Sequence, residues 1–413
     1  MFTVFFYIIM VIVVANFLLE RYLEHLNILH SSKKLPVSLK GIFDEDKYAR
    51  QQSYMKENYR FGIWSSGFNF LLILTMLFSY GFAWVNSVAA RITVDPVWWA
   101  LIFFGIILFA ADLLNLPFSV YDTFVIEQKY GFNKTTRKTF ILDKIKSLLL
   151  GAVIGGAVVA LIIWIYRRTG DWFWLLAWSV VTLLSVFISM FYSNLIVPLF
   201  NKQTPLPEGE LRTAIQGFAQ KVRFKLDNIF IIDGSKRSTK GNAYFTGLGP
   251  KKRIVLYDTL ISEMTVEELV AVLAHEIGHY KKRHVILQLF MGILQTGIIL
   301  FLFSLFVKSK SMSLALGVEE PNFHVGLVAF GILWSPVSMI TGILGNFLSR
   351  RHEFQADRFA AEEYSGAFLA CALKKLSVKN LSNLTPHPAY VFFNYSHPPL
   401  LQRLEHLEKL DTR

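Results

Sequence analysis

Seven apolar runs of membrane length recur along this chain, and they constrain its fold more than any other feature. At about 1.5 Å per residue, a helical run of this length crosses the ~30 Å hydrocarbon core of a bilayer. Of the 413 residues, 53% are hydrophobic and 17% are charged, which leaves more apolar surface than a soluble protein can hide. The sequence therefore predicts an integral membrane protein. Its candidate spans are residues 2–19, 68–88, 97–120, 145–165, 172–199, 285–307 and 325–348.

Two features built from small residues have structural rather than chemical explanations. Gly151, Gly155 and Gly156 in the fourth run favour close packing against another helix. Cys371 is the only cysteine, so no intramolecular disulfide can form, and its apolar neighbours predict a small buried residue. Neither feature is expected to take part in catalysis.

Basic residues separate the loops into two kinds. The loops after the first and third runs are rich in lysine and arginine, whereas those after the second, fourth and sixth carry one or two each. Since cytoplasmic loops carry the excess of positive charge, we expect the N-terminus outside and residues 200–284 and 349–413 in the cytoplasm. The formal charge of +12 comes without a nucleic-acid motif, so no nucleic-acid partner is predicted. The rich loops contain Arg21, Lys33, Lys34, Lys40, Lys47, Arg50, Lys56, Arg60, Lys129, Lys134, Arg137, Lys138, Lys144 and Lys146.

Residues 200–284 form the main segment outside the predicted spans. An amphipathic helix, three short strand-like runs and turn sequences predict a small α+β domain there. Thr265, with Glu268 three residues later, forms a capping box that starts a helix near Val266. The predicted elements are a helix over 208–223, strands over 228–232, 242–245 and 253–257, and turns at 233–234 and 247–250.

The capped helix carries the sequence His275-Glu276-Ile277-Gly278-His279. Two histidines four residues apart lie on one helix face, so both imidazoles can reach one metal ion. Glu276 is offset around the helix, beside a metal-bound water, where it can act as the general base. A catalytic zinc needs a third protein ligand and an open fourth position. The three-histidine subclass is excluded, because position 282 is lysine and position 285 is valine.

Glu353 is the best candidate for the third ligand. It follows the seventh run by five residues, and His279 precedes the sixth run by six. No proline interrupts residues 266–290, so we expect the metal helix to run straight into the sixth span. Because spans six and seven are antiparallel neighbours, both halves of the site should meet at the cytoplasmic membrane surface. Asp357, one turn after Glu353, could accept a hydrogen bond from a ligand histidine and fix its tautomer.

These positions divide the chain into four parts. Residues 1–199 hold transmembrane helices one to five with their cytoplasmic loops, and residues 200–284 form the cytoplasmic zinc-protease segment with the HExxH helix. Residues 285–348 hold helices six and seven, and residues 349–413 form a cytoplasmic segment with the third ligand. One Zn²⁺ ion per chain is expected, bound by His275, His279 and Glu353.

The metal motif, together with Glu353-Phe354-Gln355-Ala356-Asp357, closely resembles the integral-membrane CAAX prenyl proteases. These are zinc endopeptidases of the ER and their bacterial relatives, and the resemblance extends over nearly the whole chain. The supporting stretches are Ile126-Glu127-Gln128-Lys129-Tyr130-Gly131-Phe132-Asn133-Lys134, Pro198-Leu199-Phe200-Asn201-Lys202, Ser235-Lys236-Arg237-Ser238, Gly241-Asn242-Ala243-Tyr244-Phe245 and Ser396-His397-Pro398-Pro399.

The resemblance implies an all-α membrane protein whose seven transmembrane helices enclose a water-filled chamber. A small α+β gluzincin-type zinc metalloprotease domain would lie on its cytoplasmic side. By the same resemblance Glu276 would be the general base and Asp357 a proton donor. His397 would stabilise the oxyanion, and Arg403 would hold the substrate.

The resemblance also implies a strand that binds substrate. The run 242–245, with Asn242, Ala243 and Tyr244, would be an edge strand that pairs with the substrate backbone. Lys240, just before it, departs from the eukaryotic members, which usually carry histidine there. Because of this difference at position 240, the resemblance does not fix the fine substrate preference of this chain.

Several of these residues have a structural alternative. The run 242–245 could be a core strand, His397 a turn residue before Pro398, and Arg403 a solvated charge on a helix. Structural or solvated positions are expected for three further histidines, His284, His352 and His387.

The sequence thus predicts a zinc-dependent membrane endopeptidase, monomeric in the bilayer. The resemblance implies that it cleaves near the C-terminus of CAAX-type prenylated proteins or peptides. A bacterial relative would meet no prenylated proteins of its own and could trim unprenylated membrane proteins in quality control. The chain ends in Leu410-Asp411-Thr412-Arg413, which is no ER retrieval signal and favours a bacterial inner membrane over the ER. The remaining alternative is a non-enzymatic transporter or scaffold, against which the few polar residues in spans six and seven argue.

Overall fold

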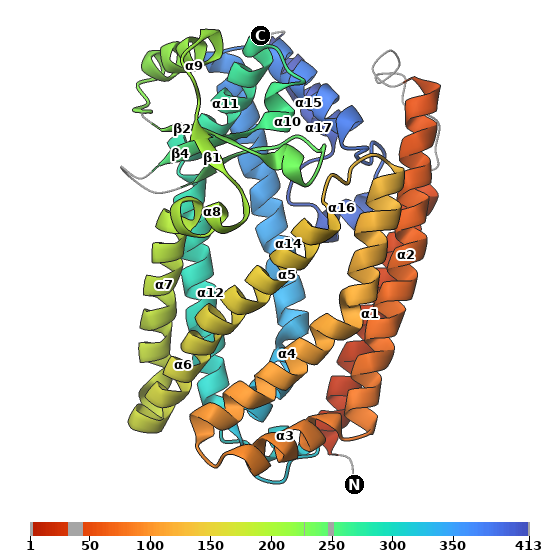
Figure 1. The fold of residues 1–413 in the computed structure, drawn as a ribbon, viewed down its shortest axis with the longest axis vertical. Coiled ribbons are helices and arrows are strands. Elements are labelled where there is room, and N and C mark those ends of the chain that lie inside the picture. Colours follow the sequence, from red (N-terminus) through yellow and green to blue (C-terminus); the bar gives the residue numbers. More distant parts are fainter. Residues whose placement is uncertain (1–2, 32–43, 227, 247–251, 412–413) are drawn as a thin grey trace.

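The structure is a computed structural model that describes residues 3–31, 44–226, 228–246 and 252–411. Long helices form one part of the molecule, and a small sheet with shorter helices covers their end opposite the N-terminus (Figure 1). The C-terminus lies at the same end as the sheet. Some predicted features lie outside the described residues, namely Phe2, Lys33, Lys34, Lys40, the turn 247–250, Thr412 and Arg413.

Six helical segments of the described chain are long and apolar enough to cross a membrane. In their most apolar windows only 6% to 11% of the residues are buried inside the protein. Apolar helices that the protein itself leaves uncovered require the hydrocarbon of a bilayer, so the chain is an integral, multi-pass membrane protein. The segments are Val4–Ser31, Glu45–Phe78, Pro96–Glu127, Arg137–Phe200, His284–Phe306 and Phe323–Glu363.

The elements of this membrane part follow one another along the chain with one interruption, the domain between Phe200 and His284. They are α1 (Val4–Ser31), α2 (Glu45–Phe78), α3 (Gly81–Ile92), α4 (Pro96–Tyr121), η2 (Asp122–Glu127), α5 (Arg137–Leu150), η3 (Gly151–Gly155), α6 (Gly156–Thr169), η4 (Gly170–Trp172), α7 (Phe173–Leu195), α8 (Val197–Phe200), α12 (His284–Phe306), α13 (Lys310–Ala315) and α14 (Phe323–Glu363).

The remaining elements form the domain at the end of the long helices. They are β1 (Gln203–Pro205), α9 (Glu210–Lys221), β2 (Ile229–Ile232), η5 (Gly234–Lys236), β3 (Ala243–Thr246), β4 (Arg253–Tyr257), α10 (Asp258–Ile261), α11 (Val266–Lys281), α15 (Gly366–Lys379), α16 (Pro388–Asn394) and α17 (Leu400–Asp411).

Helix α2 does not coincide with the predicted span 68–88. It starts much earlier, because the Asp44 side chain accepts a backbone N–H of its first turn at 2.7 Å. It ends at Phe78, since Tyr80 adopts a left-handed φ of 56° and the rest of the run forms the separate helix α3. The prediction of one span over 68–88 is therefore wrong at both ends.

The helix of the metal motif does not continue into the membrane. Helix α11 ends at Lys281, and α12 starts at His284 after Arg283, whose φ is 60°. A left-handed residue interrupts the hydrogen-bond ladder of a helix, so the chain changes direction there. The expectation of one helix over 266–290 is wrong, because the absence of proline does not by itself keep a helix continuous.

Both expectations for the small residues are wrong. Among the described residues, a Cβ atom added at Gly151 or Gly155 would meet no atom within 4 Å, and one added at Gly156 would make only an ordinary contact at 3.9 Å. These glycines border a cavity of about 1270 Å³ between α4 and α6 instead of a close helix contact. Cys371 is exposed, because α15 turns another face towards the core.

The sheet has four strands in the order β1-β2-β4-β3, with β2 and β4 parallel and the two outer strands antiparallel. The predicted strands 228–232, 242–245 and 253–257 are confirmed as β2, β3 and β4. Strand β1 was not predicted, since its three residues end in a proline and show no alternation. The sheet packs with α9, α11 and α15 around one buried apolar cluster, which holds the metal helix in place.

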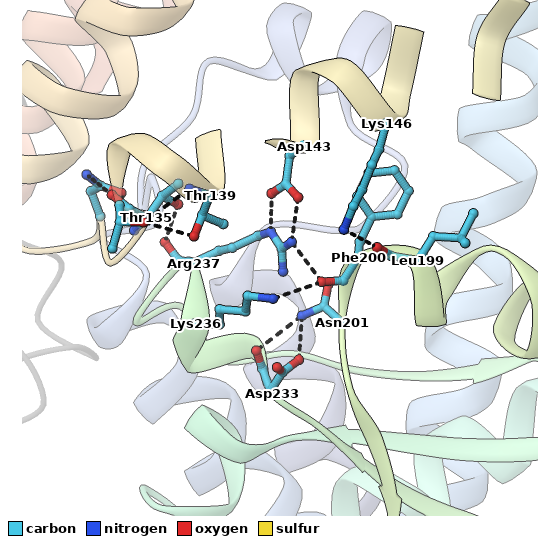
Figure 2. A network of polar contacts seen from close by, with 12 residues as sticks. Thr135, Thr139, Asp143, Lys146, Leu199, Phe200, Asn201, Asp233, Lys236 and Arg237 are labelled. Atoms are coloured by element: carbon cyan, nitrogen blue, oxygen red, sulfur yellow. Dashed lines mark hydrogen bonds and ion pairs between the residues drawn. The ribbon is translucent and has the colours of Figure 1, made fainter. Parts of the chain in front are cut away.

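Polar contacts join this domain to the membrane helix α5 (Figure 2). Arg237 donates to both carboxylate oxygens of Asp143, at 2.7 and 2.8 Å, and to the carbonyl oxygen of Phe200 at 2.8 Å. Lys146 donates to the carbonyl oxygen of Leu199 at 2.6 Å. Carbonyls at the C-terminal end of a helix lack partners within it, so these cations satisfy the end of α8 and fasten the domain to α5.

Candidate metal centre

Helix α11 presents its two histidines towards one point. Its start is fixed by the predicted capping box, in which Thr265 and Glu268 exchange side-chain to backbone hydrogen bonds. Buried apolar side chains surround most of the helix. The Nε2 atoms of His275 and His279 lie 3.1 Å apart. The spacing of four residues therefore brings both imidazoles to a common position.

Glu353 on α14 completes a cluster of three. Its Oε1 lies 3.2 Å from Nε2 of His279, and its Oε2 lies 3.5 Å from Nε2 of His275. Among the described residues, this is the one group of His, Cys, Asp and Glu side chains whose ligand atoms all lie within 4.8 Å of one another. The two helices approach closely at Gly278, where an added Cβ would lie 3.2 Å from Cα of Ala356. The glycine of the motif thus permits the distance that the cluster requires.

Asp357 and Arg403 lie behind the cluster. Oδ1 of Asp357 is 2.9 Å from Nδ1 of His275, the contact expected for fixing a ligand tautomer. Arg403 on α17 donates to both carboxylate oxygens of Asp357, at 2.9 and 2.5 Å, and its Nη1 is 3.5 Å from Oε2 of Glu353. Asp357 is 0% and Arg403 is 9% exposed, so the alternative of a solvated charge at Arg403 is wrong.

His284 contacts the other ligand histidine. Its Nδ1 lies 3.0 Å from Nδ1 of His279, its Nε2 lies 2.8 Å from Oε1 of Gln355, and its ring stacks on His352 with centroids 4.0 Å apart. Only a structural or solvated role was expected of it. Residues five apart do not share a helix face, and the left-handed Arg283 is what folds His284 back towards His279. No sequence signal marks that turn.

The two other histidines that were expected in structural or solvated positions, His352 and His387, have structural contacts. His352 is buried beneath the stack with His284. His387 caps α16, where its Nδ1 accepts the N–H of Ala389 at 3.1 Å.

His397 lies at the edge of the cluster, in the connection between α16 and α17. Its Nε2 is 3.5 Å from Oε1 of Glu353, and its side chain is 67% exposed. Its Nδ1 is 3.0 Å from the hydroxyl oxygen of Ser396. An exposed imidazole beside a buried ligand can contact a bound molecule, so the turn position and a role at the site are compatible.

The charges of the cluster shift the protonation of two groups. Burial raises the pKa of Glu276, and the neighbouring His275 and His279 oppose this shift. In the metal-free site burial disfavours a charged His275, but hydrogen bonds to Asp357 and Glu353 outweigh burial and raise the pKa of His275 to about 9. A carboxyl group with a raised pKa is suited to taking and returning a proton near neutral pH.

A divalent metal ion fits this cluster. The Nδ1 atoms of His275 and His279 already have partners, so with neutral rings the lone pairs of both Nε2 atoms face each other at 3.1 Å. Oε2 of Glu353 is buried and has no hydrogen-bond partner among the described residues. Two imidazole nitrogens and a carboxylate oxygen are the ligand set of many catalytic zinc sites.

Strand β3 is an edge strand, so the alternative of a core strand is wrong. The carbonyl oxygen of Asn242 accepts the N–H of Tyr257 on β4 at 3.1 Å. In an antiparallel pair the backbone groups alternate in direction, so those of Ala243 and Phe245 point to the open side, and those of Tyr244 point to β4. Strand β3 lies beside α11, as shown by the ring centroids of Phe245 and Tyr280, which are 5.2 Å apart.

Lys240, which precedes this strand, is held by the membrane part. Its Nζ lies 2.9 Å from Oε2 of Glu127 and 3.2 Å from the hydroxyl of Tyr54 on α2. The cation therefore links the edge strand to α2 and η2.

Comparison with known proteins decides the family. Residues 25–202 match the model described as CAAX prenyl protease N-terminal, five membrane helices, and residues 205–411 match that of peptidase family M48. The CAAX prenyl protease 1 homolog of Oryza sativa subsp. japonica is 35% identical over 97% of this chain and 96% of its own. The chain belongs to the CAAX prenyl proteases of family M48.

Two further members of the family agree. CAAX prenyl protease 1 of Saccharomyces cerevisiae is 34% identical over 97% of this chain and 94% of its own. The crystal structure of S. mikatae Ste24p matches with a TM-score of 0.93 at 35% identity, over 98% of this chain and 99% of that one.

Membership in the family confirms the predicted metalloendopeptidase of the membrane and its dependence on a metal. It also excludes a non-enzymatic transporter or scaffold. The relatives named above are eukaryotic, and a bacterial origin remains a prediction from the sequence alone.

Proposed function

We propose that this chain is a zinc-dependent endopeptidase that cleaves near the C-terminus of CAAX-type, prenylated substrates. The observation that carries the proposal is the convergence of His275, His279 and Glu353 on one point. These three side chains would hold one zinc ion per chain. The named relatives, which match nearly the whole chain, are CAAX prenyl proteases, and this supports the substrate class.

Glu276 acts as the general base. A zinc ion held by His275, His279 and Glu353 would polarise the scissile carbonyl and lower the pKa of a bound water molecule. Glu276 takes the proton of the attacking water and returns it to the leaving amine, for which its raised pKa is suited.

Asp357 and Arg403 act through the ligands. Asp357 has its oxygens engaged by His275 and Arg403 and is fully buried, so we assign it to positioning His275 rather than to direct proton donation. Arg403 in turn holds Asp357 and Glu353 in place, and a direct contact with substrate would be additional to these pairs.

Substrate is bound beside the metal on two sides. His397 donates a hydrogen bond to the oxyanion that forms on the scissile carbonyl, and its exposed ring 3.5 Å from Oε1 of Glu353 supports this role. The extended peptide adds to β3 at Asn242, Ala243 and Tyr244, through the outward backbone groups of that edge. Main-chain pairing tolerates many sequences, so prenylation would supply the selectivity that β3 lacks.

The membrane part forms seven spans around a chamber. The segment Arg137–Phe200 has 64 residues, more than twice the roughly 20 that one crossing needs, and it folds back between α6 and α7 (Figure 1). Counting it as two crossings gives seven. The parts 1–199, 200–284, 285–348 and 349–413 keep their predicted roles, with the metal centre on the cytoplasmic side and the chain a monomer.

The test combines metal content with cleavage. Purified protein is analysed for zinc and assayed on a farnesylated CAAX peptide, as wild type, Glu276→Ala and Glu353→Ala. We expect one zinc in wild type, zinc without cleavage in Glu276→Ala, and loss of zinc in Glu353→Ala. Zinc without cleavage of this peptide in wild type would favour unprenylated substrates, as in quality control in a bacterial inner membrane. Wild type without zinc, after purification free of chelators, would refute the proposal.

A further inference from the structure

A groove of about 760 Å³ runs along α2 where it faces the junction of α4 and η2. It lies far along the chain from the metal ligands and has no part in the proposed reaction. The residues that matter here are Lys56, Arg60, Phe61, Trp64, Phe118 and Tyr121, all of which line it.

The groove opens towards the bilayer. The face of α2 that carries Lys56 and Arg60 continues with Trp64 and Leu71, which are 76% and 62% exposed. On the other side of the helix the side chain of Asn69 pairs with Asn115 on α4. An exposed apolar face on a membrane helix contacts hydrocarbon, whereas a polar face turns to the interior of the protein.

The mouth of the groove carries uncompensated positive charge. Among the described residues that line it, three are cationic and one, Glu57, is a carboxylate. Glu57 already accepts from Lys129 at 2.7 Å and from the hydroxyl of Tyr130 at 2.8 Å. Lys56 and Arg60 are exposed and have no ion pair or hydrogen bond within the described chain, although Arg60 acts on Glu57 through space. With three cations against one carboxylate, the lining keeps a surplus of two positive charges.

Aromatic rings line the groove below these charges. Phe61 stacks on Tyr121 with ring centroids 5.4 Å apart, and Phe118 lies 6.2 Å from Phe61. Eight residues separate Lys56 from Trp64, which is about 12 Å along the helix axis. Cations above an apolar, aromatic wall match a molecule with an anionic head and a hydrocarbon tail.

We propose that this groove binds one anionic phospholipid. Lys56 and Arg60 bind its anionic phosphate, and an acyl chain lies against Phe61, Trp64 and Phe118. The groove is at the Glu45 end of α2, which the proposed orientation places in the cytoplasmic leaflet, where acidic lipids are enriched. A zwitterionic lipid brings its own cation to the same position and should bind less well.

Native mass spectrometry of the full-length protein tests the proposal. The delipidated protein in detergent is titrated with phosphatidylglycerol or phosphatidylcholine of equal chain length. Wild type is compared with Lys56→Gln/Arg60→Gln and with the matched control Arg137→Gln/Lys138→Gln, two exposed cations at the start of α5. We expect one tightly retained phosphatidylglycerol in wild type and control, and about tenfold or weaker retention in the first variant.

Further arms separate the alternatives. Millimolar inorganic phosphate should not displace the lipid, because the acyl chain contributes to binding. A phosphatidylglycerol with brominated acyl chains should quench the tryptophan fluorescence of wild type more than that of Trp64→Phe. This difference would place the acyl chain beside Trp64, and it does not depend on the charges of the groove. Equal retention in the two double variants, equal retention of phosphatidylcholine, or displacement by phosphate would overturn the proposal. So would a raised KM for peptide in Lys56→Gln/Arg60→Gln with lipid retention unchanged, since the groove would then bind substrate.

Discussion

The metal centre and strand β3 carry the two halves of the proposed reaction, and they are built in opposite ways. At the centre, His275, Glu353 and Asp357 are buried, and each contacts at least two other polar side chains. Strand β3 is half-exposed along its length and pairs with one strand only. Groups that hold a metal need fixed positions, whereas a surface that accepts an extended peptide needs unpaired backbone. In the proposed function, chemistry thus lies on packed helices and recognition on an open edge.

The largest effect is expected at Glu276, which belongs to the packed side but is not a ligand. Glu276→Gln should lower kcat by about 10² to 10⁴-fold with zinc content unchanged, because the amide cannot take a proton. The control is Glu267→Gln, an exposed carboxylate in the first turn of the same helix, which should retain full activity. Near-normal turnover in Glu276→Gln would mean that another group takes the proton.

Substitution of Arg403 tests how much the buried ion pair between Arg403 and Asp357 contributes to stability. Arg403→Ala should lower the free energy of unfolding by about 3–5 kcal/mol, because it leaves Asp357 buried with one partner fewer. Arg358→Ala removes an exposed pair with Glu362 on α14 and should cost under about 1 kcal/mol. Denaturant titration in detergent measures both. Equal losses would show that burial adds nothing to the Asp357 pair.

His284 tests whether the support of His279 matters for the metal. His284→Ala should weaken zinc binding by about 10 to 100-fold, because Nδ1 of His279 then loses the partner that orients its ring. Competition with a fluorescent zinc chelator measures the affinity. His387→Ala, which removes only the cap of α16, is the control and should bind zinc as wild type does. If His284→Ala bound zinc with unchanged affinity, only Asp357 and Arg403 would remain as residues that hold the ligands in position.

The pH dependence of metal binding sharpens the same point. The pKa of His275 in the metal-free protein is raised from 6.5 to about 9, so protonation of this ring stabilises the metal-free fold below pH 6.5, and the effect is lost as the pH rises towards 9. Zinc must displace that proton, and its affinity should rise about tenfold per pH unit up to about pH 9. The metal-free protein should lose thermal stability over the interval in which zinc affinity grows. A flat affinity between pH 7 and 9 would contradict the raised pKa.

The packed side could largely be predicted from sequence, for physical reasons. Spacing of four residues places His275 and His279 on one face in any helix. The antiparallel order of the last two spans brings Glu353 to the same end. Both inferences rest on periodicity and chain order, which do not depend on details of packing.

What could not be predicted depends on single backbone conformations and on neighbours. Arg283 is left-handed without being glycine, and that one residue both ends α11 and delivers His284 to the centre. Gly151 and Gly155 fit a packing motif, but the position of α4 decides that no described residue packs against them. The edge position of β3 was expected only from the family resemblance, because it follows from sheet order, which its own four residues do not encode.

The smallest effect tests the open side directly and leaves the protein unchanged. A CAAX peptide methylated at one backbone nitrogen loses one donor, which should raise KM by about 2 to 10-fold where that N–H pairs with β3. The outward groups of Ala243 and Phe245 alternate with the inward ones of Tyr244, so methylation at successive positions should be harmful at every second amide. Cleavage of each peptide at saturating concentration serves as the control, since kcat should change little. Equal tolerance of methylation at all positions would show that substrate is not added to β3 as a strand, and recognition would then have to lie with the side chains or the prenyl group.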